Sequence, residues 1–441
     1  MQVKLIAAVI SITTGGGLLY AAETNLPSAE PAQQSWNWHL QNTDILQGDP
    51  GFPAKYSGPN SLHSGGELRE SVSFDVIGGV RPWPNAEAHV DGLVWQGFGL
   101  SKTLGVEGFP NGEAFRLGTK TPNFNLCRAF VRQTIGLGGE QEQVEDDALT
   151  LAGKRDISRI TLTLGRVSVK DIFDNNSYAN DPRTQFLSWA LMANEAWDYP
   201  ADSLGYMTGF AAELNQPKWA VRYGFFQMPR VSNGTALDWN FVKAWGMVTE
   251  FERRFAFKDR PGAIRFLAFL NSAHMGSYQA AIDSPIRPAD IAATRAYRYK
   301  YGFGLNAEQE LIKNLGAFTR LGWSDGHNEG WVFSDVDRTA TFGLSLKGAS
   351  WNRTNDTYSI AGVFNGIAKV HQNFLAAGGT GILAGDGALT YGWEKILETY
   401  YDCNLWKTIH ATVDYQFITN PAFNRDRGPV SVFALRLHWT Y

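Results

Sequence analysis

Residues 165–210, GRVSVKDIFDNNSYANDPRTQFLSWALMANEAWDYPADSLGYMTGF, decide the fold expected for this chain. The residues just before this stretch, 160–164, alternate apolar side chains with threonine, and residues 206–210 alternate again. A period of two is typical of half-buried strands. Between them, residues 169–204 form a long run of Asn, Asp, Pro and aromatic residues. Because so long a connection in a compact domain is usually functional or disordered, and because this one is rich in aromatics, we predict an ordered functional loop.

The same alternation recurs along the chain in about sixteen segments, each long enough for a tilted strand to cross a bilayer. It is clearest over 295–307, where aromatic residues alternate with Arg, Lys, Gly and Asn. Long connections, such as 47–65, 100–125 and 366–392, alternate with short turns. An all-β fold is therefore predicted, a transmembrane antiparallel barrel with its 169–204 loop folded inward. Residues 139–157 are the exception, because they are long where a short turn is expected.

The N-terminal residues and the composition favour an exported, single-domain protein. Residues 1–22 combine Lys4, an apolar run and small residues, which is typical of a signal peptide, and 23–441 contain no linker that would divide them into domains. The net charge of −4 does not favour nucleic acid as a partner. The two cysteines, Cys127 and Cys403, are predicted to face lipid, to stay unpaired and to have no catalytic role.

Five stretches of the sequence resemble the OprB family of carbohydrate-selective outer-membrane porins. They are residues 165–186 (GRVSVKDIFDNNSYANDPRTQF), 102–114, 132–140 (RQTIGLGGE), 196–206 (AWDYPADSLGY) and 414–430 (DYQFITNPAFNRDRGPV). The resemblance implies passive diffusion of mono- or small oligosaccharides across the bacterial outer membrane. Its partners would be small sugars and outer-membrane lipid, and it implies neither enzymatic activity nor a cofactor.

The 169–204 loop carries the groups that a sugar path needs. Carboxylates, amides and guanidinium groups bond vicinal hydroxyls, and aromatic faces cover the C–H side of a sugar ring. The candidates are Asp171, Asp174, Asn176, Asn180, Asp181, Arg183, Trp189 and Trp197. Each also has a structural interpretation, since Asp and Asn form turns and cap helices and the tryptophans can wedge the loop against the wall.

Strand parity gathers basic residues on the predicted lumen face. They are Arg128, Arg132, Arg222, Arg265, Arg298 and Arg320. A cationic wall opposite an acidic loop would give an oriented hydrogen-bonding surface across the pore. The alternative is that these arginines form structural ion pairs.

Two other functions remain open from the sequence. One is a sugar-binding, lectin-like anchor with a plugged lumen, and the other is an outer-membrane hydrolase. The histidines lack HExxH spacing and there is no GxSxG motif, which disfavours the hydrolase. No metal site is predicted, although calcium binding by the loop carboxylates, the identity of the sugar and the choice between a monomer and a homotrimer stay undecided.

Overall fold

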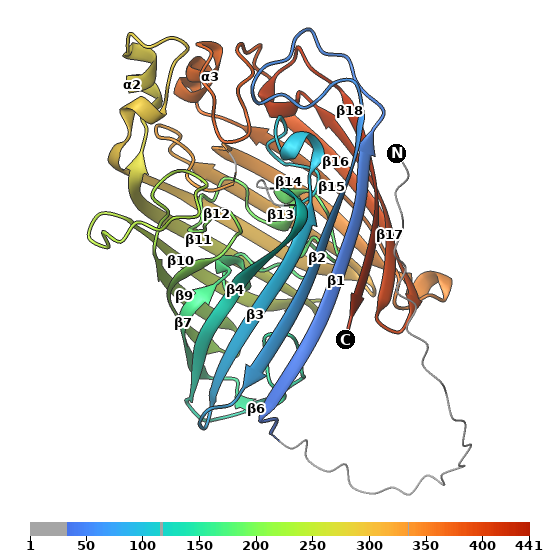
Figure 1. The fold of residues 1–441 in the computed structure, drawn as a ribbon. Helices are drawn as coiled ribbons and strands as arrows, with labels where there is room; N and C mark the ends of the chain where they lie inside the picture. Colours follow the sequence, from blue (N-terminus) through green and yellow to red (C-terminus); the bar gives the residue numbers. More distant parts are fainter. Residues whose placement is uncertain (1–32, 115–117, 334) are drawn as a thin grey trace, which may run out of the picture. The chain divides into compact units, whose positions relative to one another are not determined.

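The computed structural model describes residues 33–114, 118–333 and 335–441. The predicted signal peptide, residues 1–22, lies outside the described residues. Within them, sixteen strands close into an antiparallel barrel (Figure 1). These strands are β1 (Trp36–Asp49), β2 (Glu67–Val80), β3 (Ala86–Gly97), β4 (Thr119–Gly136), β7 (Arg159–Val167), β8 (Met207–Gln216), β9 (Trp219–Phe226), β10 (Trp245–Phe257), β11 (Arg260–Met275), β12 (Ala296–Ile312), β13 (Leu315–Ser324), β14 (Arg338–Lys347), β15 (Thr357–Gly366), β16 (Glu394–Trp406), β17 (Ile409–Thr419) and β18 (Val430–Thr440).

The first and last strands close the barrel. β1 pairs with β18 in a continuous antiparallel register from Gln41↔Thr440 to Gly48↔Phe433. All the other neighbours in the barrel also pair antiparallel, and most are consecutive in the chain. Closure removes unpaired strand edges, which is what a sheet needs in lipid. The predicted fold class and strand number are confirmed.

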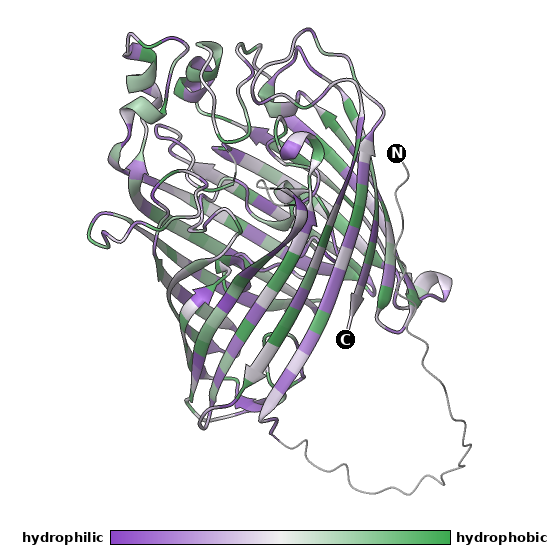
Figure 2. Ribbon diagram, viewed as in Figure 1, coloured by the Kyte–Doolittle hydropathy of each residue, from purple (hydrophilic) through white to green (hydrophobic). Residues whose placement is uncertain are grey.

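The two faces of the wall differ as the alternation predicts. On β12, Tyr297, Tyr299 and Phe303 point outward and are exposed, whereas Lys300 and Asn306 point inward and are buried. Figure 2 shows the resulting alternation of hydrophobic and hydrophilic bands along the strands. The outward face is therefore apolar because it contacts lipid, and the inward face carries the polar groups.

A bulge in β4 corrects the prediction for Cys127. The register with β3 passes from Asp91↔Arg128 to Gly92↔Leu126, so Cys127 is the extra residue. Leu126 is exposed on the outer face, but Cys127 is fully buried and packs with Leu93 and other buried residues. The bulge thus puts Cys127 and Arg128 on the inner side together. Cys403 keeps the outward parity that was predicted, and both thiols are free.

Long connections gather at one end of the barrel, which we call the loop end. They span 50–66, 98–118, 168–206, 227–244, 276–295, 325–337, 367–393 and 420–429. The predicted 100–125 connection is shorter than expected because residues from Thr119 onward already belong to β4, and 227–244 was not anticipated. These loops contain α1 (Trp189–Met192), α2 (Tyr278–Asp283), α3 (Lys369–Ala376) and the 3₁₀ turns η1 (Leu100–Lys102), η2 (Val169–Asp171), η3 (Ala292–Thr294) and η5 (Pro421–Phe423).

The opposite end, the turn end, has short connections, one of them containing η4 (Gly348–Trp351). The exception is 137–158, which forms the separate two-stranded sheet of β5 (Gln141–Val144) and β6 (Gly153–Asp156). Figure 1 shows β6 at this end and α2 and α3 at the other. In the part of the chain described, no helix has the length and apolar character to cross a membrane.

Candidate functional site

The 168–206 connection, here called the inner loop, packs against inward-facing side chains of the wall. The backbone N–H groups of Leu187 and Ser188 donate to the carboxylate of Glu398 on β16, at 2.5 and 3.0 Å. Arg436 on β18 donates from Nη1 to the carbonyls of Pro182 and Gln185, at 2.7 and 2.6 Å. The loop therefore lies inside the barrel and is held from its wall.

Inward glycines of the wall provide the space for this packing. A Cβ on Gly316 would lie 1.9 Å from the ring of Tyr178, and one on Gly322 would lie 2.1 Å from Oδ1 of Asn194. Both distances are far shorter than any van der Waals contact. The glycines that alternate with outward aromatics in the sequence thus let the inner loop approach the wall closely.

Asp174 is the buried anchor of the inner loop. Its carboxylate accepts from Arg320 Nε at 3.1 Å and from Asn306 Nδ2 at 2.7 Å, and Lys170 Nζ lies 3.2 Å away. Burial by itself raises the pKa of Asp174, but the charges of Arg320 and Lys170 outweigh it and lower that pKa to about 2. For Lys170, burial dominates and lowers the pKa to about 8. A carboxylate with this many partners fixes the loop to β12 and β13.

A second connection, 98–118, also folds inward. The carbonyl of Pro110 accepts from the side chains of Gln47 on β1 and Gln416 on β17, each at 2.8 Å. The N–H groups of Glu107 and Gly108 donate to Glu394 at 3.0 and 2.9 Å. The inward position of this segment was not predicted from the sequence.

A cavity of about 350 Å³ lies between these two connections and the wall. This volume falls in the range of roughly 300–1,000 Å³ common for small-molecule sites. One side of the cavity carries ion pairs. Arg183 Nε lies 2.9 Å from Glu113 Oε1, and its Nη1 lies 3.0 Å from Asp75.

Arg128 makes the second set of ion pairs. It donates from Nε and Nη2 to the two oxygens of Asp171, at 2.7 and 2.8 Å, and from Nη1 to Asp91 at 2.6 Å. Its guanidinium carbon also lies 5.1 Å from the centre of the Tyr206 ring. Each arginine is therefore paired with two carboxylates, so acidic groups outnumber basic groups on this side of the cavity.

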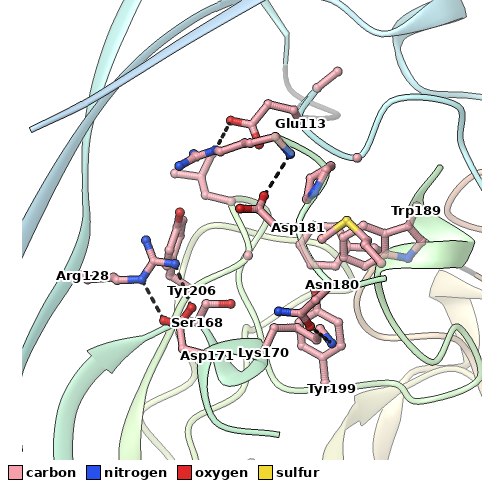
Figure 3. A pocket seen from close by; sticks show the side chains of 18 of the residues that line it. Glu113, Arg128, Ser168, Lys170, Asp171, Asn180, Asp181, Trp189, Tyr199 and Tyr206 are labelled. Atoms are coloured by element: carbon pink, nitrogen blue, oxygen red, sulfur yellow. Dashed lines mark hydrogen bonds and ion pairs between the residues drawn. The ribbon is translucent and has the colours of Figure 1, made fainter. Parts of the chain in front are cut away.

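Aromatic rings form the other side of the cavity. The rings of Phe109 and Trp189 are stacked with centroids 5.1 Å apart and planes at 14°. Tyr199 and Phe333 continue this surface, with Phe333 4.8 Å from Trp189. Figure 3 shows Trp189 and Tyr199 across the cavity from Arg128 and Asp171. The cavity thus presents a hydrogen-bonding side and an apolar, flat side to the same solute.

The structure divides the predicted residues into two groups. Those that line the cavity are Arg128, Asp171, Asn180, Asp181, Arg183 and Trp189. The others do not line the cavity. Three of them belong to the inner loop, namely Asp174, Asn176 and Trp197, and five lie on strands of the wall, namely Arg132, Arg222, Arg265, Arg298 and Arg320.

The second group has structural contacts. Arg222 pairs with Glu213, Glu250 and Glu252, and Arg265 pairs with Glu252 and Glu308. Asn176 bonds Asn306 at 2.8 Å, Trp197 packs edge-on against Phe173, and Arg298 donates to the Thr294 carbonyl. Arg132 contacts the 137–158 connection.

Several residues that line the cavity were not predicted from the sequence. Glu113 and Phe109 come from the 98–118 connection, and Lys170, Tyr199 and Tyr206 come from the inner loop. Glu113 and Phe109 lie within residues 102–114, a block that resembles the family, so this resemblance could have indicated a functional role for them. Among the described residues, no group of three or more His, Cys, Asp or Glu side chains is arranged to hold a metal ion.

A closed antiparallel barrel with an apolar outer face, short turns at one end and long loops at the other defines the class of bacterial outer-membrane β-barrel proteins. The family model "Carbohydrate-selective porin, OprB family" matches residues 60–441, and the chain belongs to this family. In such barrels the short turns face the periplasm.

Solved structures share the fold. The chain matches the high-pH structure of Pseudomonas putida OprB with a TM-score of 0.70 at 16% identity, covering 92% of this chain and 94% of that one. The low-pH structure of the same protein matches with a TM-score of 0.50 at 12% identity, covering 92% of this chain and 93% of that one.

Curated relatives include porin AaxA of Chlamydia trachomatis serovar D and of Chlamydia abortus. The first is 22% identical over 63% of this chain and 51% of its own length, and the second is 22% identical over 64% and 54%. The chain thus spans about half the length of these relatives.

Proposed function

We propose that the protein is a passive channel for mono- or small oligosaccharides in the bacterial outer membrane, and that the cavity is its selective step. The observation that carries this is the pairing of two sides within one cavity of about 350 Å³. Stacked rings face guanidinium–carboxylate pairs. Pyranose sugars have the same two-sided chemistry, with an apolar C–H face and a rim of hydroxyls.

The ion pairs disfavour an anionic solute. Arg183 and Arg128 each already bind two carboxylates, so an anion would have to displace one of these partners. A hydroxyl can bond to both members of such a pair at once, because it donates to the carboxylate and accepts from the guanidinium. Release requires weak binding, and millimolar affinity corresponds to about 4 kcal/mol.

The predicted site residues then take two roles. Asp171, Asn180, Asp181, Arg183, Trp189 and Arg128 would touch the sugar, together with Glu113 and Phe109. Asp174, Asn176, Trp197, Arg222, Arg265, Arg298 and Arg320 would hold the inner loop and the wall in position. Export through an N-terminal signal peptide at 1–22 remains part of the proposal, and the assembly would be a monomer or a homotrimer.

The experiment is single-channel recording of the refolded protein in a planar bilayer, titrated with glucose and then maltose. Stepwise current that glucose blocks reversibly at millimolar concentration is expected. Glu113→Gln should weaken the block, because it removes a charged partner of Arg183, whereas Gln143→Ala on exposed β5 should leave it unchanged.

A folded, heat-modifiable barrel without conductance would contradict the proposal. It would favour the plugged, lectin-like anchor, and sugar turnover by the same preparation would favour the hydrolase.

A further inference from the structure

The 137–158 connection differs from the other connections at the turn end. Its neighbours along the chain, such as 81–85 and 217–218, are tight turns, but this one contains the β5–β6 sheet, paired from Gln141↔Asp156 to Val144↔Gly153. Between β5 and β6, Asp147 and Thr150 each donate a backbone N–H to the other's carbonyl at 3.0 Å. The segment is therefore an ordered hairpin with a defined tip, residues 147–149, which we call the tip.

The tip reaches the cavity. The cavity is lined by Asp147, Ala148 and Leu149 of the tip, together with Arg128, Asp171 and Arg183. Leu149 also packs against the buried cluster that contains Phe109, Trp189 and Tyr199. A connection that starts at the periplasmic end thus contributes to the same cavity as the inner loop, which starts at the opposite end.

An inward side chain of β1 tethers the tip. Asn37 is 5% exposed, and its Nδ2 lies within bonding distance of Asp146 Oδ1 at 2.8 Å and of the carbonyls of Asp147 and Thr150 at 3.0 and 3.2 Å. The nearby Leu151 is buried, and its N–H donates to Glu87 on β3 at 3.4 Å. Strand residues therefore hold the hairpin from two sides.

Two arginines on the inner face of β4 hold the inner loop and the tip at different heights along this strand. Arg128 binds Asp171 of the inner loop, and Arg132 donates from Nη1 to the Leu149 carbonyl of the tip at 2.9 Å. Arg132 lies four residues nearer the turn end, which is about 13 Å along a strand. The inner loop and the tip are thus fixed to the same strand, one above the other along the path of a solute.

We propose that the tip is a second specificity-determining element, in which Leu149 and Asp147 limit the length of the saccharide that passes. This rests on the proposed sugar transport. A monosaccharide is accommodated between the inner loop and the tip. A longer saccharide has to thread both at once, with Leu149 against its C–H face and Asp147 accepting from its hydroxyls.

The first test measures the size dependence of flux by liposome swelling with glucose, maltose and a trisaccharide such as raffinose. Leu149→Gly removes the side chain at the tip, and Asn37→Ala releases the tether. Each should raise the maltose-to-glucose rate ratio severalfold and increase single-channel conductance. The matched control is Gln143→Ala, on the same hairpin but exposed and away from the cavity, which should change neither.

The second test does not depend on loosening the hairpin. Ala148→Cys is made in a background in which Cys127 and Cys403 are replaced by serine, and is treated with a bulky methanethiosulfonate reagent. Modification should lower the current severalfold, whereas Gln143→Cys, modified in the same way, should not.

The proposal is overturned if folded Leu149→Gly and Asn37→Ala keep the wild-type rate ratio and conductance, or if modified Ala148→Cys conducts normally. Failure of the proposed transport function is distinguishable, because the wild-type protein would then show either no conductance or conductance that glucose does not block.

Discussion

Arginines of the same strand parity take different roles according to their depth in the packing. Arg128 on β4 lines the cavity, whereas Arg320 on β13 is fully buried and binds Asp174 together with the carbonyls of Leu191 and Ala179. A parity count identifies an inward face but does not indicate what covers it. Burial by the inner loop turns an inward arginine into part of the scaffold.

Replacing Arg320 by Met should loosen the inner loop around Asp174. Removing one partner of a buried ion pair costs up to roughly 3–5 kcal/mol, and Asp174 would keep only Lys170 and Asn306 as side-chain partners. We expect a lower unfolding midpoint in denaturant, larger conductance and loss of glucose block. Arg320→Lys should be intermediate, since it keeps the charge but loses the bonds of the guanidinium fork. Wild-type stability and block in the Met variant would contradict the anchoring role.

On acidification, Glu113 in the cavity should take up a proton at a higher pH than Asp174, which anchors the inner loop. Burial raises the pKa of Glu113 above its usual 4.5, although Arg183 opposes this, so Glu113 takes up a proton at a higher pH than a free glutamate. Asp174 has its pKa lowered from 3.8 to about 2. Its stabilising contribution is therefore complete above its unfolded value and is lost as the pH falls through about 2.

We therefore expect cation preference, measured from reversal potentials, to fall on acidification at a pH above 4.5 while the barrel stays folded. The Glu113→Gln variant should show, already at neutral pH, the lower cation preference that the wild-type protein shows in acid. Its cation preference should not change further over this pH range. An unchanged titration in that variant would assign the effect to another group.

At the scale of elements, the β4 bulge sets which side chains enter the lumen. Phe124 and Leu126 point outward before it, and Phe130 points inward after it. The alternation of apolar and polar residues predicted the strand but not the reversal of inward and outward positions at the bulge. The residues before the bulge and those after it each alternate regularly, so the extra residue between them is not evident from the pattern. The bulge is recognised only from the pairing with β3.

Deleting Cys127 should leave the barrel intact, because Leu126 and Arg128 then become consecutive and keep their partners Gly92 and Asp91 with their faces unchanged. Deleting Ala129 instead should disrupt it, since β4 regains its alternation only by turning Arg128 towards lipid, which costs about 2–4 kcal/mol near the bilayer midplane. We expect the heat-modifiable band in electrophoresis to persist in the first variant and to be lost in the second. Loss of the band on deletion of Cys127 would contradict the bulge.

At the scale of the whole molecule, pairing between β1 and β18 joins the first and last strands of the barrel. Leu46 pairs with Leu435, and both point outward. Opposite residues of an antiparallel pair have Cα atoms about 4.5–5.5 Å apart, within the range that a disulfide spans.

Leu46→Cys with Leu435→Cys, in a background lacking Cys127 and Cys403, should form a disulfide on oxidation. The cross-linked barrel should need more denaturant to unfold than its reduced form. The control pair, Leu46→Cys with Leu437→Cys, is offset along β18 and should cross-link poorly, because diagonal neighbours lie about 7–8 Å apart. Equal cross-linking of the two pairs would argue against this register.

The sequence by itself determined the barrel, its strand number and the long connection at residues 169–204. Strand periodicity and connection length are local properties, so they can be read without knowing what packs against what. Only the tertiary structure decided that 98–118 and the 137–158 hairpin also reach the lumen, because this depends on distant partners such as Gln416 for Pro110 and Asn37 for the tip. It likewise separated Arg128, which lines the cavity, from Arg320, which anchors the loop, since the height of a residue along the barrel and the segment covering it arise only when the wall closes.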